Sequence, residues 1–315
     1  MTTTTAIATP ADVPSAMRAR YEEHIELITK GTGRLMLFAG DQKVEHLNDD
    51  FVGTLADGAS IAAADADPEH LFRIASGGVI GCFAAQLGLI ARYARDYRDV
   101  PYVVKLNSKS HLIKTQQADP RSLGWVTAED ALALREEGVR VVGVGFTVYL
   151  GSAFESEQMR EAAQACVAAH RNGLVAVVWV YPRGAAVSDE FDPHLIAGAT
   201  GLGLTLGADF VKVNYPRPKD GRSPAEAFRE AVAAAGRTRV ITAGGSSTDV
   251  RRFLQTLHDQ IFIAGAHGSA TGRNIHQKPL DEAVRMTRAI SAITYGGWGV
   301  DDAMAVYEGR KEFAA

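Results

Sequence analysis

Short apolar runs that alternate with helix-like segments constrain the fold of this chain more than any other feature. Continuous apolar runs are typical of parallel strands that are covered on both faces. A chain that alternates such strands with helices predicts an α/β fold, and eight units in succession predict a single closed (β/α)8 TIM barrel. The runs are Leu35–Gly40, Gly78–Phe83, Pro101–Asn107, Val139–Phe146, Leu174–Tyr181, Ala208–Pro216, Arg239–Ala243 and Ile261–Ala264.

The segments between these runs carry helix start signals. Asp67-Pro68, Thr127, Asp192-Pro193 and Ser223-Pro224 each resemble the N-terminus of a helix. A doubly wound open sheet is the alternative, but it usually has a glycine-rich fingerprint after its first strand, and this sequence has none there. We expect residues 1–30 to form an N-terminal arm and short helix, residues 31–294 the barrel, and residues 295–315 a C-terminal extension.

Composition excludes several classes of function. The 315 residues are 46% apolar and carry a net charge of −4, with both signs spread along the chain. This balance gives no electrostatic reason to expect nucleic acid or an anionic membrane as a partner. No apolar run reaches the 18 residues that a membrane span needs. Cys82 and Cys166 stand in apolar contexts, and Met1–Pro14 lacks the features of a signal peptide, so we expect a cytoplasmic protein.

A lysine inside the sixth apolar run is the most unusual residue of the sequence. Lys212 occupies an inward-looking position between Gly207 and Pro216. A buried ammonium loses hydration, so it must pair with an anion, reach back to solvent, or give up its proton and become a nucleophile. This stretch alone leaves a solvent-reaching lysine and a nucleophile equally open.

Polar side chains also appear where the other predicted strands end. In a (β/α)8 barrel, the C-terminal ends of all strands open onto one mouth, which is where active sites of this fold lie. We therefore expect a functional mouth built from these strand-end residues. They are Asp41, Lys105, Trp179, Tyr181, Lys212, Ser246 and Arg273.

Two glycine-containing loops indicate the class of ligand. Gly244-Gly245-Ser246-Ser247-Thr248 and Gly272-Arg273-Asn274 follow the last two predicted strands, where barrels bind phosphate through backbone N–H groups. A buried Lys212 beside a phosphorylated carbonyl compound is the arrangement that Schiff-base chemistry requires. Lys105 or Arg183 would keep Lys212 neutral by charge repulsion, and Tyr181 with Asp41 would transfer protons.

The histidines give a weaker signal. His46, His111, His194, His267 and His276 are scattered, and no pair has the spacing of metal ligands, so the sequence predicts neither a metal nor another cofactor. Glu45 and His46 are expected to form a local pair after the first strand. His267 is expected in the eighth loop, either in contact with substrate or bonded to the backbone.

Taken together, these residues resemble the archaeal-type class I fructose-bisphosphate aldolases, a family also found in bacteria. The resemblance covers about Leu35 to Ile293, and Glu45-His46-Leu47-Asn48 departs from the family's usual E-H-G-P. The matching segments are Asp41–His46, Val104–Asn107, Trp179–Gly184, Val211–Val213, Ala243–Ser246 and Gly272–Asn274.

The resemblance implies a metal-independent aldolase of glycolysis and gluconeogenesis that is a homo-oligomer and acts on a phosphosugar. Lys212 would form the imine with dihydroxyacetone phosphate, Tyr181 would be the general acid/base, and Asp41 the assisting carboxylate. The implied substrate-binding residues are Trp179, Lys105, His46, Arg183, Gly244, Gly245, Ser246, Gly272 and Arg273. A thiolase-like acyltransferase, a transaldolase-like synthase on a related phosphorylated ketone, and a non-enzymatic phosphosugar-binding barrel remain alternatives.

Overall fold

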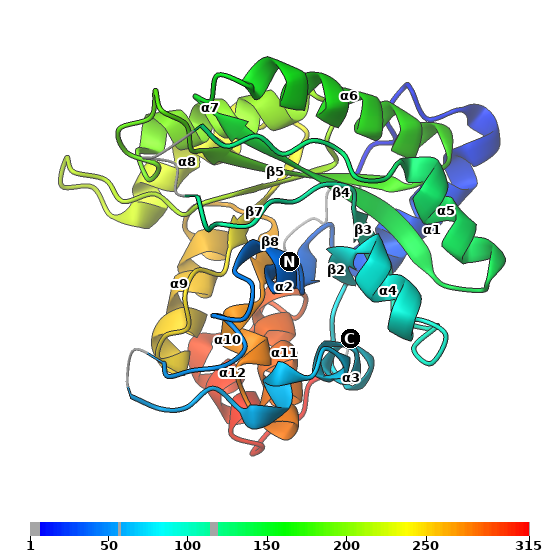
Figure 1. Ribbon diagram of the computed structural model, residues 1–315. Coiled ribbons are helices and arrows are strands. Elements are labelled where there is room, and N and C mark those ends of the chain that lie inside the picture. Colours follow the sequence, from blue (N-terminus) through cyan, green and yellow to red (C-terminus); the bar gives the residue numbers. More distant parts are fainter. Residues whose placement is uncertain (1–6, 56–57, 114–118, 315) are drawn as a thin grey trace.

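The computed structural model describes residues 7–55, 58–113 and 119–314, so part of the predicted N-terminal arm and part of the loop after the third strand lie outside the described residues. Eight parallel strands form a closed barrel in sequence order (Figure 1), which confirms the predicted fold. The strands are β1 (Leu35–Ala39), β2 (Cys82–Gln86), β3 (Tyr102–Lys105), β4 (Val141–Leu150), β5 (Val175–Pro182), β6 (Phe210–Val213), β7 (Arg239–Ala243) and β8 (Gly268–Thr271).

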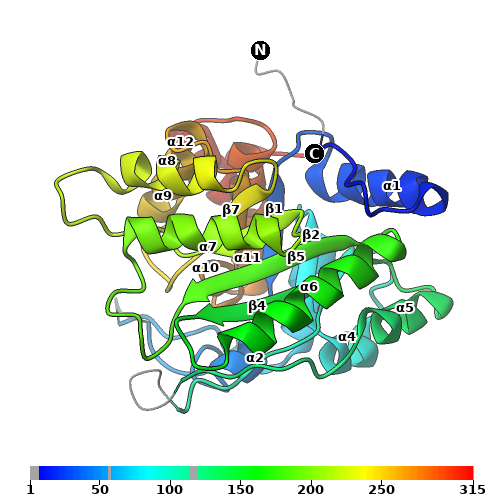
Figure 2. The ribbon, with the colours of Figure 1, turned by 90° about the horizontal axis from the view of Figure 1, so that it is seen from above.

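Helices surround this barrel, and in both ribbon views α6 and α7 run along the outside of β4 and β5 (Figures 1 and 2). The last three long helices, α9, α11 and α12, pack against one another. The helices are α1 (Arg18–Thr29), α2 (Gln42–Glu45), α3 (Glu69–Gly77), α4 (Leu87–Tyr93), α5 (Ala128–Glu136), α6 (Glu155–Arg171), α7 (Pro193–Thr205), α8 (Pro224–Ala234), α9 (Val250–Phe262), α10 (Arg273–His276), α11 (Leu280–Thr294) and α12 (Val300–Tyr307), with short 3-10 turns at Ser15–Met17 and Ala63–Ala66.

Three helix starts follow the sequence rules closely. Thr127 and Ser223 each form a capping box with an acidic residue three positions later. The Asp192 side chain accepts hydrogen bonds from two backbone N–H groups of α7, and Pro193 takes the first helical position. Such caps satisfy N–H groups that have no partner within the helix. The helix beginning after Asp67 differs in detail, because Pro68 is its N-cap and Asp67 accepts a hydrogen bond from the N–H of Glu69.

The prediction of the eighth strand was wrong. Ile261 and Phe262 end helix α9, whose buried positions include Phe253, Leu254 and Leu257, a helical spacing. The true β8 is Gly268–Thr271, four small residues that lack the apolar signature of a strand. Glycine is required at the first of them, because a Cβ on Gly268 would lie 2.0 Å from the Leu35 carbonyl oxygen and the backbone φ is +129°.

The second strand also begins later than predicted. Gly78–Gly81 precede the strand, and β2 runs from Cys82 to Gln86. The short helix α4 (Leu87–Tyr93) begins directly after this strand. The strand therefore extends as far as Gln86, next to Lys105 of β3.

The apolar core has two parts. One fills the space between the strands and the surrounding helices, and the other fills the barrel interior. The interior cluster also includes Tyr21, Ile25 and Ile28 of α1, which together with the strand residues close the N-terminal end of the barrel. There the Tyr21 hydroxyl donates to Asp209, at 2.5 Å, just before β6. With that end filled by α1, the C-terminal mouth is left for the site.

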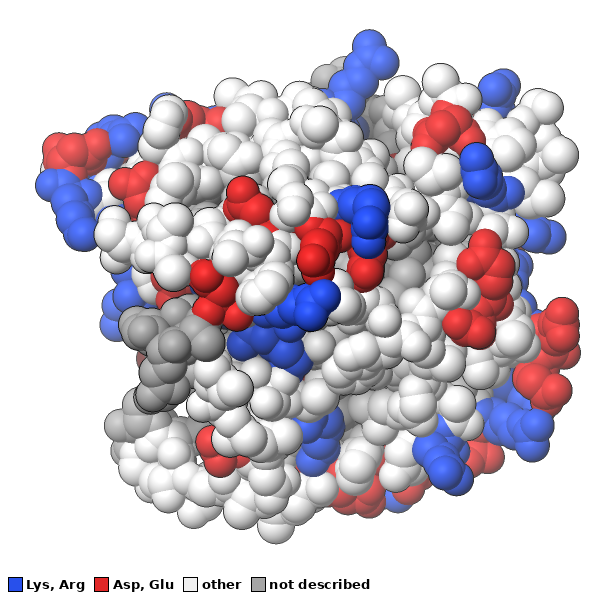
Figure 3. All heavy atoms as spheres, turned by 45° about the horizontal axis from the view of Figure 1, so that its top comes forward, with Lys and Arg blue, Asp and Glu red and all other residues white. Residues whose placement is uncertain are grey.

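Charged side chains of both signs are mixed on the surface, as the composition predicts. On the face in Figure 3, acidic and basic side chains are interspersed and neither sign forms a continuous patch. None of the helices in the described residues is both long enough and apolar enough to cross a bilayer.

Candidate active site

Strand alternation directs four of the predicted side chains into the barrel. Successive side chains of a strand point to opposite faces, so residues two apart share a face. Val103 and Phe210 belong to the interior core, and the next residues on the same face of β3 and β6 are Lys105 and Lys212. Trp179 and Tyr181 continue the interior face of β5 in the same way. The sequence pattern therefore brings two lysines and two aromatic residues together at the mouth.

Lys105 is held by a buried anion. Its Nζ lies 3.6 Å from Asp41 Oδ2, in a pair whose side chains are almost fully excluded from water, and it donates to Thr147 Oγ1 at 2.5 Å. The same Nζ lies 3.8 Å from the centre of the Trp179 ring. Burial lowers the pKa of Lys105, and the negative charges of Asp41 and Glu45 oppose that shift.

Lys212 is buried without such a partner. Its Nζ lies 5.4 Å from the centre of the Trp179 ring, and no ion pair or hydrogen bond to this amine occurs among residues 7–55, 58–113 and 119–314. Burial lowers the pKa of Lys212, and the positive charges of Arg273 and Arg183 act in the same direction, against Asp41 and Glu45. Trp179 thus stands beside both amines, one paired and one unpaired.

A glycine on β4 makes this arrangement possible. Gly145 pairs with Lys105 on one side and Val177 on the other. A Cβ on Gly145 would lie 2.5 Å from the Trp179 ring and 3.1 Å from Lys105 Cδ. The missing side chain provides the space in which the indole and the lysine pack together.

Tyr181 lies two residues beyond Trp179, on the same face of β5. Its ring stacks on Tyr149 with 6.3 Å between centres, and the Arg183 guanidinium lies 4.6 Å from the centre of the Tyr181 ring. Burial raises the pKa of the Tyr181 phenol, so this group holds its proton at neutral pH. Arg183 in turn forms an ion pair with Glu190.

The two predicted phosphate loops are tied together by Asn274. Its amide donates to the carbonyl oxygens of Gly244 and Ser246, and its carbonyl oxygen accepts from the N–H of Thr248. Gly245 has a φ of +69°, in the left-handed region that favours glycine. Asn274, which follows β8, therefore holds the backbone of the loop after β7 in place.

The close packing of the loop after β8 also requires glycine. A Cβ on Gly272 would lie 2.3 Å from Gln42 Nε2. Arg273 begins the single-turn helix α10 and lies 3.6 Å from Asp50, whose other oxygen is 3.8 Å from His46 Nδ1. Arg273 and His46 therefore both lie close to the Asp50 carboxylate at the mouth.

Sequence reasoning missed part of this mouth. Thr147 and Tyr149 lie on β4 beyond the predicted end of that strand, and Glu190 comes from the loop after β5. Glu45 was expected only as a local partner of His46, yet burial and the charge of Asp41 raise its pKa to about 7. The alternation of polar and apolar residues past Phe146 was the signal that could have extended β4.

The remaining histidines behave differently from one another. His267 accepts from the N–H of Val240, which confirms the expected bond to the backbone. It precedes β8 at the closed end of the barrel, so its predicted place in the loop after the eighth strand was wrong. His194 pairs with Glu230 on the surface, and His276 is buried against Asp65. His111 was not expected near His46, but their rings stack with 4.9 Å between centres.

Comparisons with known proteins all point to aldolases. Residues 35–278 match the DeoC/LacD family aldolase. The chain is 52% identical over 307 residues to a fructose-bisphosphate aldolase/6-deoxy-5-ketofructose 1-phosphate synthase of Methanocaldococcus jannaschii, covering 97% of this chain and 96% of the relative. It is 34% identical over 274 residues to a class 1 fructose-bisphosphate aldolase of Halobacterium salinarum, covering 86% and 94%.

Solved structures agree. A fructose-bisphosphate aldolase from Slackia heliotrinireducens superposes with a TM-score of 0.94 at 55% identity, covering 98% of this chain and 96% of that one. An archaeal fructose-1,6-bisphosphate aldolase whose catalytic lysine is covalently bound to the carbinolamine intermediate superposes with a TM-score of 0.73 at 31% identity, covering 87% and 99%. The chain therefore belongs to the DeoC/LacD aldolase family and, within it, to the class I fructose-bisphosphate aldolases, which are lyases that work through a Schiff base.

Proposed function

We propose that this aldolase cleaves and forms fructose 1,6-bisphosphate through an imine between Lys212 and the ketone carbon of the substrate. One observation carries the choice of lysine. Lys212 is a buried amine at the barrel mouth whose pKa is lowered and which has no anionic partner among the described residues, whereas Lys105 is paired with Asp41. Only an amine that can release its proton at neutral pH is a nucleophile.

The proposed reaction forms a covalent imine on Lys212 and then hydrolyses it. The neutral amine adds to the C2 carbonyl, and the carbinolamine loses its hydroxyl as water to give a protonated imine. Removal of the C4 hydroxyl proton breaks the C3–C4 bond, and its electrons move into the imine to give an enamine while glyceraldehyde 3-phosphate leaves. The enamine then takes a proton at C3, and water releases dihydroxyacetone phosphate and restores the amine of Lys212.

Tyr181 and Asp41 are our candidates for the proton transfers. Burial keeps the Tyr181 phenol protonated, so it can donate to the departing carbinolamine hydroxyl and later accept the C4 proton. Asp41 is held by Lys105 and stabilises positive charge as the imine forms. The Trp179 indole N–H is buried and unpartnered among the described residues, which fits a donor that awaits a substrate oxygen.

Substrate phosphate is proposed to bind beside Lys212 at the loops after β7 and β8. Gly244, Gly245 and Ser246 would contribute the first loop, and Gly272 and Arg273 the second. The shape that Asn274 gives to these loops supports this role, and Arg273 supplies a cation at the mouth. The rest of the sugar would contact Lys105, Arg183 and His46.

A second activity deserves a direct test, because the 52% identical relative carries two functions in its name. The enamine left on Lys212 can add to any aldehyde that fits the mouth, so the triose unit could be transferred to another acceptor. Transaldolase-type synthesis of 6-deoxy-5-ketofructose 1-phosphate would follow from the same imine. Incubation with fructose 1,6-bisphosphate and a second aldehyde should yield a new ketose phosphate if this transfer occurs.

Borohydride trapping tests the proposed function. Reduction in the presence of dihydroxyacetone phosphate should attach the triose phosphate to the peptide that contains Lys212, and cleavage activity should survive EDTA. Lys105→Met should retain the adduct and Lys212→Met should lose it. An adduct on Lys105, or none on the wild type, would refute the assignment.

We further propose that the enzyme is a cytoplasmic homo-oligomer acting in glycolysis or gluconeogenesis. Two buried free thiols, Cys82 and Cys166, fit a reducing compartment. Light scattering coupled to gel filtration measures the assembly directly, and a monomeric mass at micromolar concentration would contradict it.

A further inference from the structure

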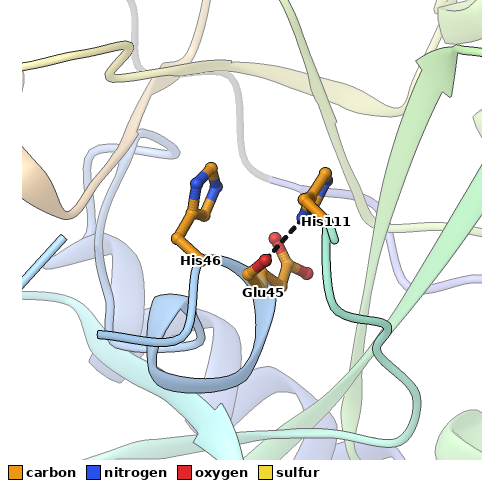
Figure 4. Close-up of side chains that lie close together, drawn as sticks. All are labelled: Glu45, His46 and His111. Carbon is orange, nitrogen blue, oxygen red and sulfur yellow. Dashed lines mark hydrogen bonds between the residues drawn. The ribbon is translucent and has the colours of Figure 1, made fainter. Parts of the chain in front are cut away.

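Three potential metal ligands gather at the mouth from two separate loops. Glu45 ends α2, His46 follows it, and His111 comes from the loop after β3. One ligand atom from each residue can be chosen so that all three lie within 4.8 Å of one another. Figure 4 shows the two imidazoles facing each other, with the Glu45 carboxylate beside His111 and between the two rings in that view. The N–H of His111 also donates to the carbonyl oxygen of Glu45 at 2.9 Å, which fixes the two loops together.

The tautomer of His111 follows from its backbone contact. Nδ1 lies 2.7 Å from the carbonyl oxygen of Glu45, and a carbonyl oxygen can only accept, so Nδ1 carries the hydrogen. In the neutral ring, Nε2 then has a free lone pair. That atom is buried and has no hydrogen-bond partner in the described structure. Histidine ligands of metals are typically oriented in this way, by donating their other ring N–H to a backbone carbonyl or a carboxylate.

The other two residues have similar outer contacts. His46 Nδ1 lies 3.8 Å from Asp50 Oδ2, so a small rotation would let it donate to this carboxylate and leave Nε2 free. Glu45 Oε1 accepts a hydrogen bond of 3.3 Å from Ser108, which orients the carboxylate. Each of the three candidate ligands therefore has a neighbour placed to orient it.

We propose that Glu45, His46 and His111 bind a divalent transition-metal ion, with Zn²⁺ as its representative. Two imidazoles and one carboxylate with an open fourth position are a known ligand set for zinc, whereas Mg²⁺ and Ca²⁺ prefer oxygen ligands. Tetrahedral zinc with bonds of about 2.1 Å needs donor atoms about 3.4 Å apart. The His46 and His111 rings are stacked, with planes 18° apart, so their in-plane lone pairs do not converge on one point. Binding an ion therefore requires His46 to turn out of the stack and Glu45 to rotate about its side-chain bonds, which brings the three donor atoms closer together.

The bound ion would join the loops after β1 and β3 on the Lys105 side of the mouth. Lys212 and the phosphate loops contribute no ligand, but His46 is also a proposed contact of the sugar and the charge of Glu45 acts on the pKa of Lys212, so metal binding is measured in the absence of substrate. The open coordination position is available to water or to an oxygen of a mouth ligand. This proposal and the imine assignment can therefore succeed or fail separately.

Metal titration of the full chain tests the site. Tag-free protein is stripped with EDTA, freed of the chelator and titrated with ZnCl2 by calorimetry in a buffer without phosphate. We expect one ion per chain and a rise in the melting temperature on binding. His111→Ala and His46→Ala should each weaken binding by at least about 10-fold, and Glu45→Gln, which keeps an acceptor for Ser108, should weaken it as well.

His194→Ala provides a matched control. His194 forms a pair with Glu230 at the surface, so this variant removes a histidine from a His–Glu contact of similar composition but without a second imidazole. It should bind zinc like the wild type, and MgCl2 should give no saturable heat with either protein. Circular dichroism of the metal-free variants checks that each is folded. The proposal is overturned if the wild type binds no zinc, or if folded His46→Ala and His111→Ala bind it as tightly as His194→Ala.

Discussion

Lys105 and Lys212 are two buried lysines at the same mouth, beside the same tryptophan, and they differ in their partners. Lys105 has an aspartate at 3.6 Å and a threonine hydroxyl at 2.5 Å, while the Lys212 amine has no ion-pair or hydrogen-bond partner among the described residues and lies 5.4 Å from the centre of the Trp179 ring. Burial lowers the pKa of both. Deprotonating Lys105 would leave the buried Asp41 carboxylate without its counter-charge, which is why we propose Lys212 as the nucleophile.

Lys212→Met should produce the largest effect and test this difference on the catalytic side. Without the amine no imine can form, so kcat for aldol cleavage should fall by at least about 10³-fold. Because no ion pair is broken, urea unfolding should give a free energy equal to that of the wild type or greater. If Lys212→Met lost stability but kept its cleavage activity, the roles proposed for Lys105 and Lys212 would have to be exchanged.

Lys105→Met should have the opposite signature. Removing this cation leaves Asp41 buried and unpaired, which costs about 3–5 kcal/mol of unfolding free energy. Chemical denaturation of this variant beside Lys212→Met measures the contrast between the two amines. Equal stability of the two variants would show that the Asp41 contact contributes nothing.

His170 and His24 extend the comparison to the closed end of the barrel. His170 lies between Asp12 and Asp209, and although burial opposes it, its contacts with Asp209 raise its pKa to about 9. His24 meets only the Gly173 carbonyl oxygen as a hydrogen-bond partner in the described structure, and burial lowers its pKa to about 4. Here too a carboxylate partner, more than burial, decides which group keeps its proton.

This contrast predicts a pH dependence of stability. A folded-state pKa above the unfolded value of about 6.5 means that His170 stabilises the fold fully below that pH and loses the contribution as pH rises through about 9. The loss should approach about 3 kcal/mol between pH 6 and pH 10. Urea unfolding of the wild type and His170→Gln across this range measures it, and parallel curves for the two proteins would contradict the assignment.

Gly145→Ala should give the smallest effect and sharpen the comparison within the mouth. The new methyl group would press on Trp179 and on Lys105 Cδ, so we expect a destabilisation of about 1–3 kcal/mol. Borohydride trapping at Lys212 should persist, because the methyl group contacts Trp179 and Lys105 and no atom of Lys212 is among its three nearest neighbours. Gly198→Ala, where a Cβ meets nothing within 4 Å, is the matched control.

Local rules predicted much of the fold. The caps at Thr127, Asp192 and Ser223 agree with the sequence because capping depends on neighbouring residues alone. The eighth strand was not predicted because its four small residues carry no apolar signal, and the need for Gly268 depends on how closely β8 approaches β1. The apolar Ile261–Ala264 was mistaken for that strand although its first residues complete a helical pattern.

The candidate site, too, could be predicted only in part from the sequence. Residues at strand ends could be predicted because a parallel barrel brings those ends to one mouth, whatever the loops do. The pairing of Asp41 with Lys105, the contact of Arg273 with Asp50, and the meeting of His46 with His111 could not, since each joins residues from different loops.

By itself, the sequence determined the alternation of strands and helices, the lysine on the sixth strand and the glycine loops beside it, because periodicity and strand-end chemistry are local properties. Only the tertiary structure decided which of two buried lysines has an anionic partner and which histidines face each other. Those properties depend on distances between residues that are as far apart in the chain as Asp41 and Lys105. The sequence around either residue does not indicate which side chain it will pair with across the closed barrel.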